Sequence, residues 1–545
     1  MKKLVYMITI LTVVLLITSC QSDYGVENKP VQSIPEGKTV LGKQLQNPYS
    51  VTNMNIAYEN LKKSGKIQEE LKIQPTNLYV RLLPENYETY DKLVNDKTLD
   101  LFDYPIDYEI VQQGNFYHDT SIPETHPTWQ YTVVSLDYQP PTGVKMEVLE
   151  KLYLPEQAIK ISKNLSKQNE LLIEELEYES LKITGNLSDV NSLSKGSGWG
   201  LPAKWRPAGK IQVWDNRLQK YVGIAGVKVR AWRLFGGVVE GITDNNGNFS
   251  CDGEFRYDAN YCIVWETEKF DIRSGTFGQA KYDGPKIKGD WNLKINGGIQ
   301  STYAHVFRGA YRYSYGDIGG LSRPNLPLKL KYAVYDERGE DQGVNIGNWT
   351  VFGSNPNILI YRYSSNGYEY SSDEIFSTTC HETAHTTHLQ IMNGAVNFGM
   401  INEEIRESWA VGVEWFITQK EYKERGISNY ADPNYTDGDF YPIQYGYQHW
   451  FSINSEYSPV FIDLVDNYNQ LGQSFPGKNN GTINDAVTGY TLASIESGFL
   501  NKVYRMNPIM VVGKNPIGSS LRSELKANKP TGVTNTQIDK LIDSY

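Results

Sequence analysis

The sequence predicts a multidomain protein of the α+β class with three folded parts. They are a small α+β domain over residues 51–200, a β-sandwich over 204–298, and a mostly helical domain with a short sheet over 299–545. A chain of 545 residues is long enough for about three to five domains. Short β-type runs separated by turns dominate the middle of the chain, and clear helical stretches dominate its last part. Aromatic residues at 12% and moderate charge exclude a disordered chain.

The overall charge is acidic, with 63 Asp and Glu against 53 Lys and Arg and a formal net charge of −10. Nucleic acid binding needs concentrated Lys and Arg, so nucleic acid is not expected as a partner. Histidine is scarce, and the seven histidines stand at positions 118, 126, 305, 381, 385, 388 and 449. Because three of the seven fall within eight residues, this cluster is the strongest functional signal in the sequence.

The N-terminus predicts export. Residues 1–19 have a basic start followed by an apolar run that is too short to span the ~30 Å hydrocarbon core comfortably. The small residues directly before Cys20 resemble the lipobox of bacterial lipoproteins, although an ordinary secretory signal with an incidental cysteine is the alternative. The resemblance implies a lipid on Cys20 and a place in the bacterial cell envelope, at the outer membrane or the cell surface. Residues 20–50 are polar and are expected to form a tether.

The region 51–200 is predicted to be a small α+β domain without a catalytic signature. The expected strands are Asn77–Leu83, Trp129–Tyr138 and Val144–Leu154, and the expected helices are Glu85–Val94 and Leu165–Leu181. His118 and His126 lie in loop-like sequence, where a lone histidine is more often a solvated polar residue than a metal ligand.

The region 204–298 is predicted to be a β-sandwich because short strands recur at intervals of about 8–12 residues. The expected strands are Gly209–Trp214, Gly226–Trp232, Val238–Thr243 and Asn248–Cys251. Residues 244–248 (DNNGN) form the clearest turn, since Asn, Asp and Gly tolerate the left-handed conformation. The pattern over 209–266 resembles the carboxypeptidase regulatory-like domains of secreted bacterial proteins, which implies a supporting module rather than an active site.

The cysteines are compatible with export and leave one question open. Cys251 and Cys262 form either a disulfide, which an oxidising compartment permits, or two buried free thiols. Cys380 has no evident partner and is expected to be a small buried apolar residue.

The main functional motif is H-E-x-x-H at His381–His385, within a predicted helix over Ser371–Met392. Residues four apart lie on one face of a helix, so His381 and His385 can bind one metal ion. Glu382 projects from the neighbouring face and can reach a metal-bound water. Ser371 or Ser372 is expected to cap the helix.

A catalytic zinc site needs a third protein ligand. His388 lies seven residues after the first motif histidine, ~10 Å along a helix, which is too far for the same ion. It is expected to contact substrate, to support a ligand or to lie on the rim. The helix predicted over Asn402–Ile417 offers Glu407, which faces apolar neighbours and therefore points to a buried surface. Glu414 is the second candidate on that face, as a ligand or as a supporting group.

The sequence HETAH, followed after 21 residues by ESWA, resembles the gluzincin zinc peptidases. The resemblance implies a zincin-type domain with His381, His385 and Glu407 as zinc ligands and Glu382 as the general base. Some features depart from the family. The spacing found in zinc aminopeptidases would select Glu404 as the third ligand, their G-x-M-E-N motif is absent, and the Asp that follows the ligand in thermolysin-like enzymes is replaced by Val.

A second electrophile is expected within Tyr441–Trp450, because a tetrahedral oxyanion needs stabilisation beyond the metal. His449 is the candidate proton donor or oxyanion partner, with Tyr445 and Tyr447 as alternatives; a structural role is equally compatible with the sequence. The strand Ile358–Tyr363 is expected to pair with an extended substrate, as in the gluzincins generally.

These features together predict a lipid-anchored extracytoplasmic zinc metallopeptidase that acts on peptides or proteins. The alternative is a non-catalytic surface binding or adhesion lipoprotein that uses the sandwich and the 39 Tyr for recognition. The retained Glu382 favours the enzyme, since a binding protein has little need for that base. Substrate identity and the choice between endo- and exopeptidase activity stay open.

Overall fold

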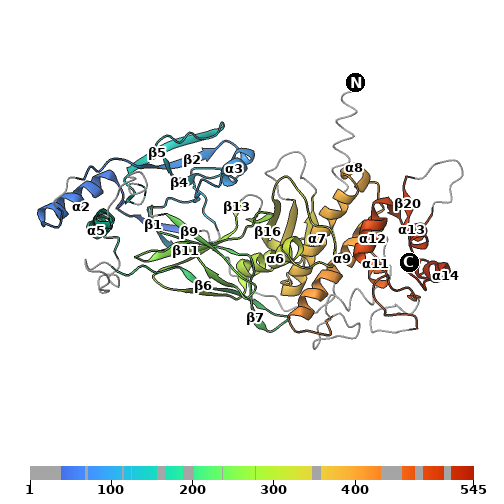
Figure 1. Cartoon of the computed structure of the whole chain (residues 1–545). Helices are drawn as coiled ribbons and strands as arrows, with labels where there is room; N and C mark the ends of the chain where they lie inside the picture. Colours follow the sequence, from blue (N-terminus) through green and yellow to red (C-terminus); the bar gives the residue numbers. More distant parts are fainter. Residues whose placement is uncertain are drawn as a thin grey trace, which may run out of the picture.

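The computed structural model describes residues 39–67, 71–155 except 113, 115 and 124, residue 157, 167–187, 202–275 except 236, 278–346, 357–430, 457–472, 483–508 and 517–545. Within these residues the chain is a multidomain mixture of helices and several sheets, compatible with the predicted α+β class (Figure 1). The predicted signal peptide, Cys20 and most of the tether lie outside the described residues, as does the segment with Tyr445, Tyr447 and His449. Among the described residues, no helix is both long and apolar enough to span a membrane.

The N-terminal part is built on a three-stranded antiparallel sheet with β2 at its centre. The sheet contains β2 (Asn77–Pro84), β4 (Gln130–Ser135) and β5 (Val144–Leu152), and a separate pair contains β1 (Val40–Gln44) and β3 (Tyr108–Gln112). The helices are α2 (Val51–Lys63), α3 (Tyr87–Val94) and α5 (Lys167–Ile183). Helix α3 begins two residues later than predicted because the Asn86 side chain caps it, accepting a hydrogen bond from the Thr89 amide at 2.9 Å.

Two four-stranded sheets follow. One contains β6 (Ala208–Asp215), β7 (Lys220–Gly223), β10 (Asn248–Ser250) and β15 (Trp291–Ile295); the other contains β8 (Lys228–Trp232), β9 (Val238–Ile242), β11 (Ala259–Val264) and β14 (Lys281–Ile287). Ile211 and Val213 of the first sheet share one apolar cluster with Val229 and Ile263 of the second. The two sheets therefore bury their facing sides against each other. In the predicted turn, the Asp244 carboxylate accepts hydrogen bonds from backbone amides and Gly247 has φ 82°.

Cys251 and Cys262 are both free and buried. Successive side chains of a strand point to opposite faces of the sheet. On β11, Tyr261 and Ile263 belong to the cluster between the sheets together with Cys251, whereas Cys262 belongs to the cluster shared with the N-terminal part. The two thiols therefore lie in different parts of the core, and the disulfide alternative is not realised.

A five-stranded sheet joins the middle and the C-terminal part. Its order is β13 (Gly278–Gln279), β12 (Phe270–Ser274), β16 (Leu330–Arg338), β18 (Ile358–Tyr363) and β17 (Gly343–Asn345), with β12–β16 and β16–β18 parallel. Strand β12 falls in the range expected for the sandwich, so this sheet crosses the expected boundary at residue 298. The strand Ile358–Tyr363 is not the edge that the sequence analysis expected, because β17 pairs with residues 358–360.

Three long helices follow: α6 (Gly298–Tyr315), α7 (Ser372–Ile391) and α9 (Glu403–Glu424). Helices α6 and α7 pack against this sheet, and α9 packs against α7 (Figure 1). Helix α9 runs seven residues past its predicted end, and Gly426, with φ 113°, follows it. The smaller elements are α8 (Ala395–Phe398), α11 (Val460–Asp463), α12 (Leu492–Gly498), the 3₁₀ turn Leu500–Lys502, β19 (Val503–Arg505), β20 (Ser519–Ser520), α13 (Leu521–Ala527) and α14 (Asn535–Ile542). Their apolar side chains form one cluster around Trp409 of α9.

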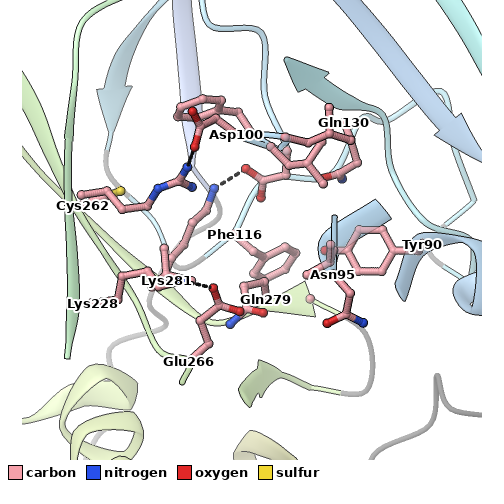
Figure 2. A pocket seen from close by; sticks show the side chains of 18 of the residues that line it. Tyr90, Asn95, Asp100, Phe116, Gln130, Lys228, Cys262, Glu266, Gln279 and Lys281 are labelled. Atoms are coloured by element: carbon pink, nitrogen blue, oxygen red, sulfur yellow. Dashed lines mark hydrogen bonds and ion pairs between the residues drawn. The ribbon is translucent and has the colours of Figure 1, made fainter. Parts of the chain in front are cut away.

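A cavity of about 860 Å³ lies between the N-terminal part and the strands of the middle part (Figure 2). Aromatic and charged side chains line it, and His118 and His126 are among them. The cations shown in its wall have acidic partners: Lys281 pairs with Asp103, Arg230 with Asp100 and Lys228 with Glu266. None of the residues of the H-E-x-x-H motif lines this cavity.

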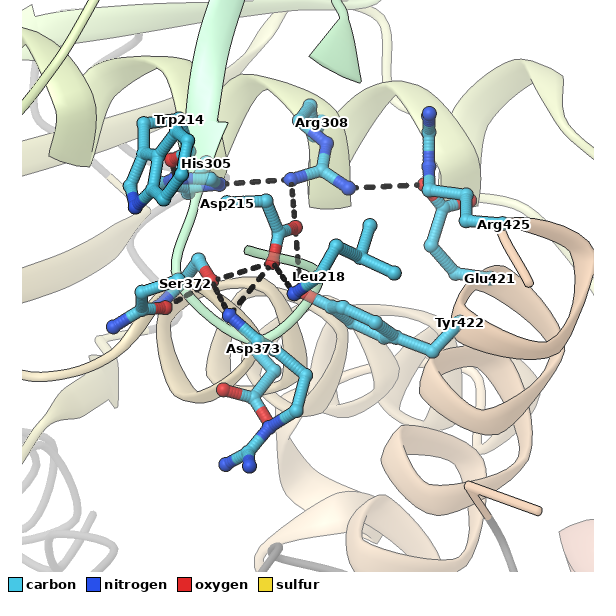
Figure 3. Close-up of polar contacts among 12 residues, drawn as sticks. Trp214, Asp215, Leu218, His305, Arg308, Ser372, Asp373, Glu421, Tyr422 and Arg425 are labelled. Atoms are coloured by element: carbon cyan, nitrogen blue, oxygen red, sulfur yellow. Dashed lines mark hydrogen bonds and ion pairs between the residues drawn. The ribbon is translucent and has the colours of Figure 1, made fainter. Parts of the chain in front are cut away.

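Asp215 joins the sandwich to the helices (Figure 3). Its fully buried carboxylate, at the end of β6, accepts hydrogen bonds from Arg308 of α6 at 2.8 Å, Ser372 of α7 at 2.9 Å and Tyr422 of α9 at 3.1 Å. Burial raises the pKa of Asp215, but the charge of Arg308 and the hydrogen bonds to the carboxylate together outweigh this effect and hold the pKa well below its usual range. Arg308 also contacts Glu421 at 3.3 Å. One buried carboxylate thus fixes three helices against the end of strand β6.

We predict that Asp215→Asn lowers the free energy of unfolding by about 3 kcal/mol, because it removes one acidic partner of a buried arginine. Because the pKa of Asp215 is depressed by folding, its contribution is present above about pH 4 and is lost as the pH falls. Urea unfolding followed by tryptophan fluorescence measures the change. The control is Glu254→Gln, whose exposed pair with Arg206 should contribute less than about 0.5 kcal/mol. Equal losses in the two variants would contradict the assigned role of Asp215.

Candidate metal centre

Helix α7 carries the motif and is buried along almost its whole length, from Ser372 to Leu389. Its start has a capping box: the Ser371 hydroxyl accepts from the Glu374 amide, and the Glu374 carboxylate accepts from the Ser371 amide at 2.6 Å. Ser371 is therefore the cap, while the Ser372 hydroxyl binds Asp215. These contacts set the rotation of α7, so that the faces of its side chains are fixed relative to α9 and the sheet.

His381 and His385 meet Glu407 of α9. The Glu407 Oε2 atom lies 3.3 Å from His381 Nε2 and 3.1 Å from His385 Nε2. The three potential ligand atoms all lie within 4.8 Å of one another, and all three side chains are buried. Glu404, the alternative third ligand, lies almost one turn earlier on α9 and is not part of this group.

Glu414 supports the group from the same face of α9, two turns after Glu407. Its Oε2 atom lies 3.0 Å from His381 Nδ1. In the tautomer in which Nδ1 carries the proton, His381 donates to Glu414 and turns its Nε2 lone pair toward Glu407. A carboxylate behind an imidazole in this way orients the ring and increases its basicity as a ligand. Of the two roles that the sequence left open for Glu414, the geometry favours support.

The electrostatics of the Glu407 carboxylate also favour the binding of a cation. Burial raises the pKa of Glu407, but the imidazoles of His385 and His381 outweigh this effect and hold it well below its usual range. Two imidazole nitrogens and one carboxylate oxygen are a donor set that zinc accepts, and three protein ligands leave a position for water or substrate. The residues present therefore fit a zinc ion.

Glu382 lies beside this group without touching it. It is fully buried, and neither of its carboxylate oxygens has a hydrogen-bond partner among the described residues. Burial raises the pKa of Glu382 to about 7, although the nearby imidazoles act in the opposite direction. Strand β17 packs over it: Asn345 donates to the Glu382 carbonyl at 2.7 Å and also contacts Thr386. A buried carboxyl group with a pKa of about 7 can accept and release a proton near neutral pH.

His388 does not lie on the rim. It is fully buried, edge-on to Phe398 at 5.3 Å and to Trp409 at 6.2 Å between ring centroids. Its ring nitrogens have no hydrogen-bond partner among the described residues, and burial lowers its pKa to about 3. His388 is therefore a neutral ring in an aromatic environment. His449, Tyr445 and Tyr447 lie outside the described residues, so their predicted roles stay predictions.

Gly343 of β17 allows the close approach to Glu382. A Cβ atom at this position would lie 2.8 Å from Glu382 Oε1, 2.9 Å from its Cγ and 2.6 Å from Thr378 Cγ2. We predict that Gly343→Ala lowers the free energy of unfolding by about 1–3 kcal/mol, since both neighbours are buried and one must move. Chemical unfolding measures the difference.

The matched control is Gly498→Ala. A Cβ atom there meets no atom within 4 Å. The change is expected to stay within about 0.5 kcal/mol. An unchanged stability of Gly343→Ala would show that β17 does not confine Glu382.

Comparison with known proteins gave no match. No family of known proteins matches this chain, and neither the curated proteins nor the solved structures contain a match.

Proposed function

We propose that this protein is a zinc-dependent metallopeptidase that hydrolyses peptide bonds, with Glu382 as the general base. One observation carries the proposal: His381, His385 and Glu407 converge within 4.8 Å of one another, beside a buried Glu382 whose oxygens have no described partner. The resemblance of HETAH and ESWA to the gluzincins supports the same class. Under this proposal, residues 299–545 form the zincin-type domain and 204–298 the supporting sandwich.

His381, His385 and Glu407 would hold the zinc, with Glu414 orienting His381. When bound, zinc supplies Lewis-acid chemistry that acidifies a water molecule and polarises the scissile carbonyl. The Glu382 carboxylate takes a proton from the attacking water and delivers it to the leaving amine. Its burial keeps the carboxylate desolvated, and because no donor among the described residues binds its oxygens, both are available for this transfer.

The substrate is proposed to be a peptide or protein in extended conformation. Because β17 ends the sheet among the described residues and lies over Glu382, a substrate strand would add to β17 rather than to β18. His449 remains the proposed proton donor or oxyanion partner. The lipobox-like sequence supports attachment through a lipid on Cys20 in the cell envelope.

The alternative function is non-catalytic binding at the cell surface. The cavity of about 860 Å³ between the N-terminal part and the middle strands favours it, since such a volume suits a small ligand. Only the peptidase function requires the Glu382 carboxylate, so a variant at this position distinguishes the two functions.

We predict that Glu382→Gln retains about one zinc per chain but loses at least ~100-fold in the rate of peptide hydrolysis. Zinc is measured by atomic emission, and hydrolysis with a fluorescently labelled protein substrate. The amide keeps the size of the side chain but cannot accept the proton. Undiminished hydrolysis in the variant would contradict the mechanism, and absence of zinc from the parent chain would contradict the proposed metal.

A second prediction separates the two candidate third ligands. Glu407→Ala is expected to lower zinc affinity by at least ~100-fold, because it removes one of three protein ligands. Glu404→Ala is the matched control on the same helix and should keep the parent affinity. Competition with a chromogenic chelator measures both. The opposite order would make Glu404 the ligand.

A further inference from the structure

A second group of oxygen ligands lies near the C-terminus, and no motif in the sequence indicates it. Asp463 ends α11, Asp466 follows three residues later, and Asp485 comes from a separate segment. One carboxylate oxygen from each residue lies within 4.8 Å of the other two. The spacing of these three residues matches no metal motif, because the chain brings them together only on folding.

Asp485 has no side-chain partner within the described protein, and the Val487 amide is the backbone group that acts on its carboxylate. Its side chain is 4% exposed, and neither of its carboxylate oxygens has a hydrogen-bond partner among the described residues, although one of them points into the group. Asp463 is fully buried and accepts hydrogen bonds from Gln470 Nε2 at 3.2 Å and from the Tyr545 hydroxyl. Neither Asp463 nor Asp485 forms an ion pair with a basic side chain in the described part of the chain.

Two buried carboxylates whose oxygens lie within 4.8 Å of each other are unfavourable when both are ionised and no cation is bound. Burial first, and the neighbouring acids second, raise the pKa of both Asp463 and Asp485 far above its usual range; the Val487 amide acts in the opposite direction on Asp485. Such a group is stable only when it takes up protons or a cation. A proton on Asp485 would have no acceptor within hydrogen-bond distance among the described residues, whereas a cation would coordinate the carboxylate oxygens.

We propose that Asp463, Asp466 and Asp485 bind one calcium ion. The group offers only oxygen donors, which hard cations prefer, and it contains no imidazole or thiol that would favour zinc. Ca²⁺ with ligands at about 2.4 Å accepts oxygens up to about 4.8 Å apart, and its flexible coordination suits an irregular set better than the strict octahedron of Mg²⁺. This proposal does not depend on the peptidase function.

Calcium at this position stabilises the contact between the C-terminal residues and α11, which packs against the helix that carries Glu407. Tyr545 at the end of the chain donates to Asp463, which belongs to α11. Helix α11 in turn packs on α9: the Phe461 and Trp409 rings are 5.3 Å apart, and the Ser458 amide donates to the Ser408 hydroxyl at 2.8 Å. Glu407 precedes both contacts on α9. The ion therefore acts as a structural clamp on the helix that carries Glu407.

The test uses the full purified chain, stripped of metal with a chelator and then saturated with ZnCl₂, so that responses to CaCl₂ do not arise at the other centre. Calorimetric titration with CaCl₂ is expected to show one ion per chain. At a hundredfold excess over Kd, the melting temperature should rise by about 5 °C or more. MgCl₂ at the same concentration should have a much smaller effect.

Asp485→Asn is expected to abolish both the heat of binding and the rise in melting temperature. Without calcium this variant should melt at or above the parent, because it removes one of the buried like charges. Asp290→Asn, an exposed substitution of the same type far from the group, should keep the parent response to calcium. Asp466→Asn, the half-buried member, is a second variant with the same expected loss of binding.

Three results would overturn the proposal: no heat and no thermal shift with CaCl₂ in the parent chain, an undiminished calcium response in Asp485→Asn and Asp466→Asn, or an equal response to MgCl₂. The first would mean that the carboxylates hold protons. The zinc content and the hydrolysis rate are measured separately, so failure here leaves the peptidase proposal intact.

Discussion

A polar helix buried on every side is the constraint on which the rest of the structure depends. Helix α7 is rich in Thr, Ser and acidic residues, yet it runs through the interior from Ser372 to Leu389. Its hydroxyl groups are satisfied by backbone carbonyls one turn earlier, as with Thr379 and Thr383, or by tyrosines of neighbouring elements, as with Tyr332. The surrounding sheet and helices must supply hydrogen-bond partners for the polar side chains of α7, and this requirement constrains their positions. A buried helix with fixed rotation is a rigid support for a metal centre.

The long-range contacts of α7 explain why the parts of the chain are not independent. Asp215 reaches it from the sandwich, Glu407 and Glu414 from α9, and Gly343 from the sheet edge. Each contact buries a charge or closes a gap, and each is costly to remove. The candidate centre is therefore held by three elements that fold around one helix.

Much of the fold and of the candidate metal centre can be predicted from the local sequence. The motif, a cap at Ser371 or Ser372 and the inward direction of Glu407 follow from helical periodicity and capping rules that act over a few residues. The remainder depends on pairing between distant segments, which periodicity does not encode: β17 covers the strand expected at the edge, and β12 joins a sheet beyond the sandwich. The grouping of Asp463, Asp466 and Asp485 likewise depends on contacts between distant segments.

The parallel pairing of β12 with β16 limits which segments of the gene can be exchanged or duplicated separately. A gene fragment that starts at residue 299 would encode β16 and β18 without β12, which pairs with the other side of β16, leaving an open apolar sheet edge prone to aggregation. Ile299 and Tyr303 of α6 would lose their sandwich neighbours in the shared core. The sandwich and the helical region can therefore be exchanged or duplicated only together, and recombination between related genes should preserve the whole span from β6 to α9.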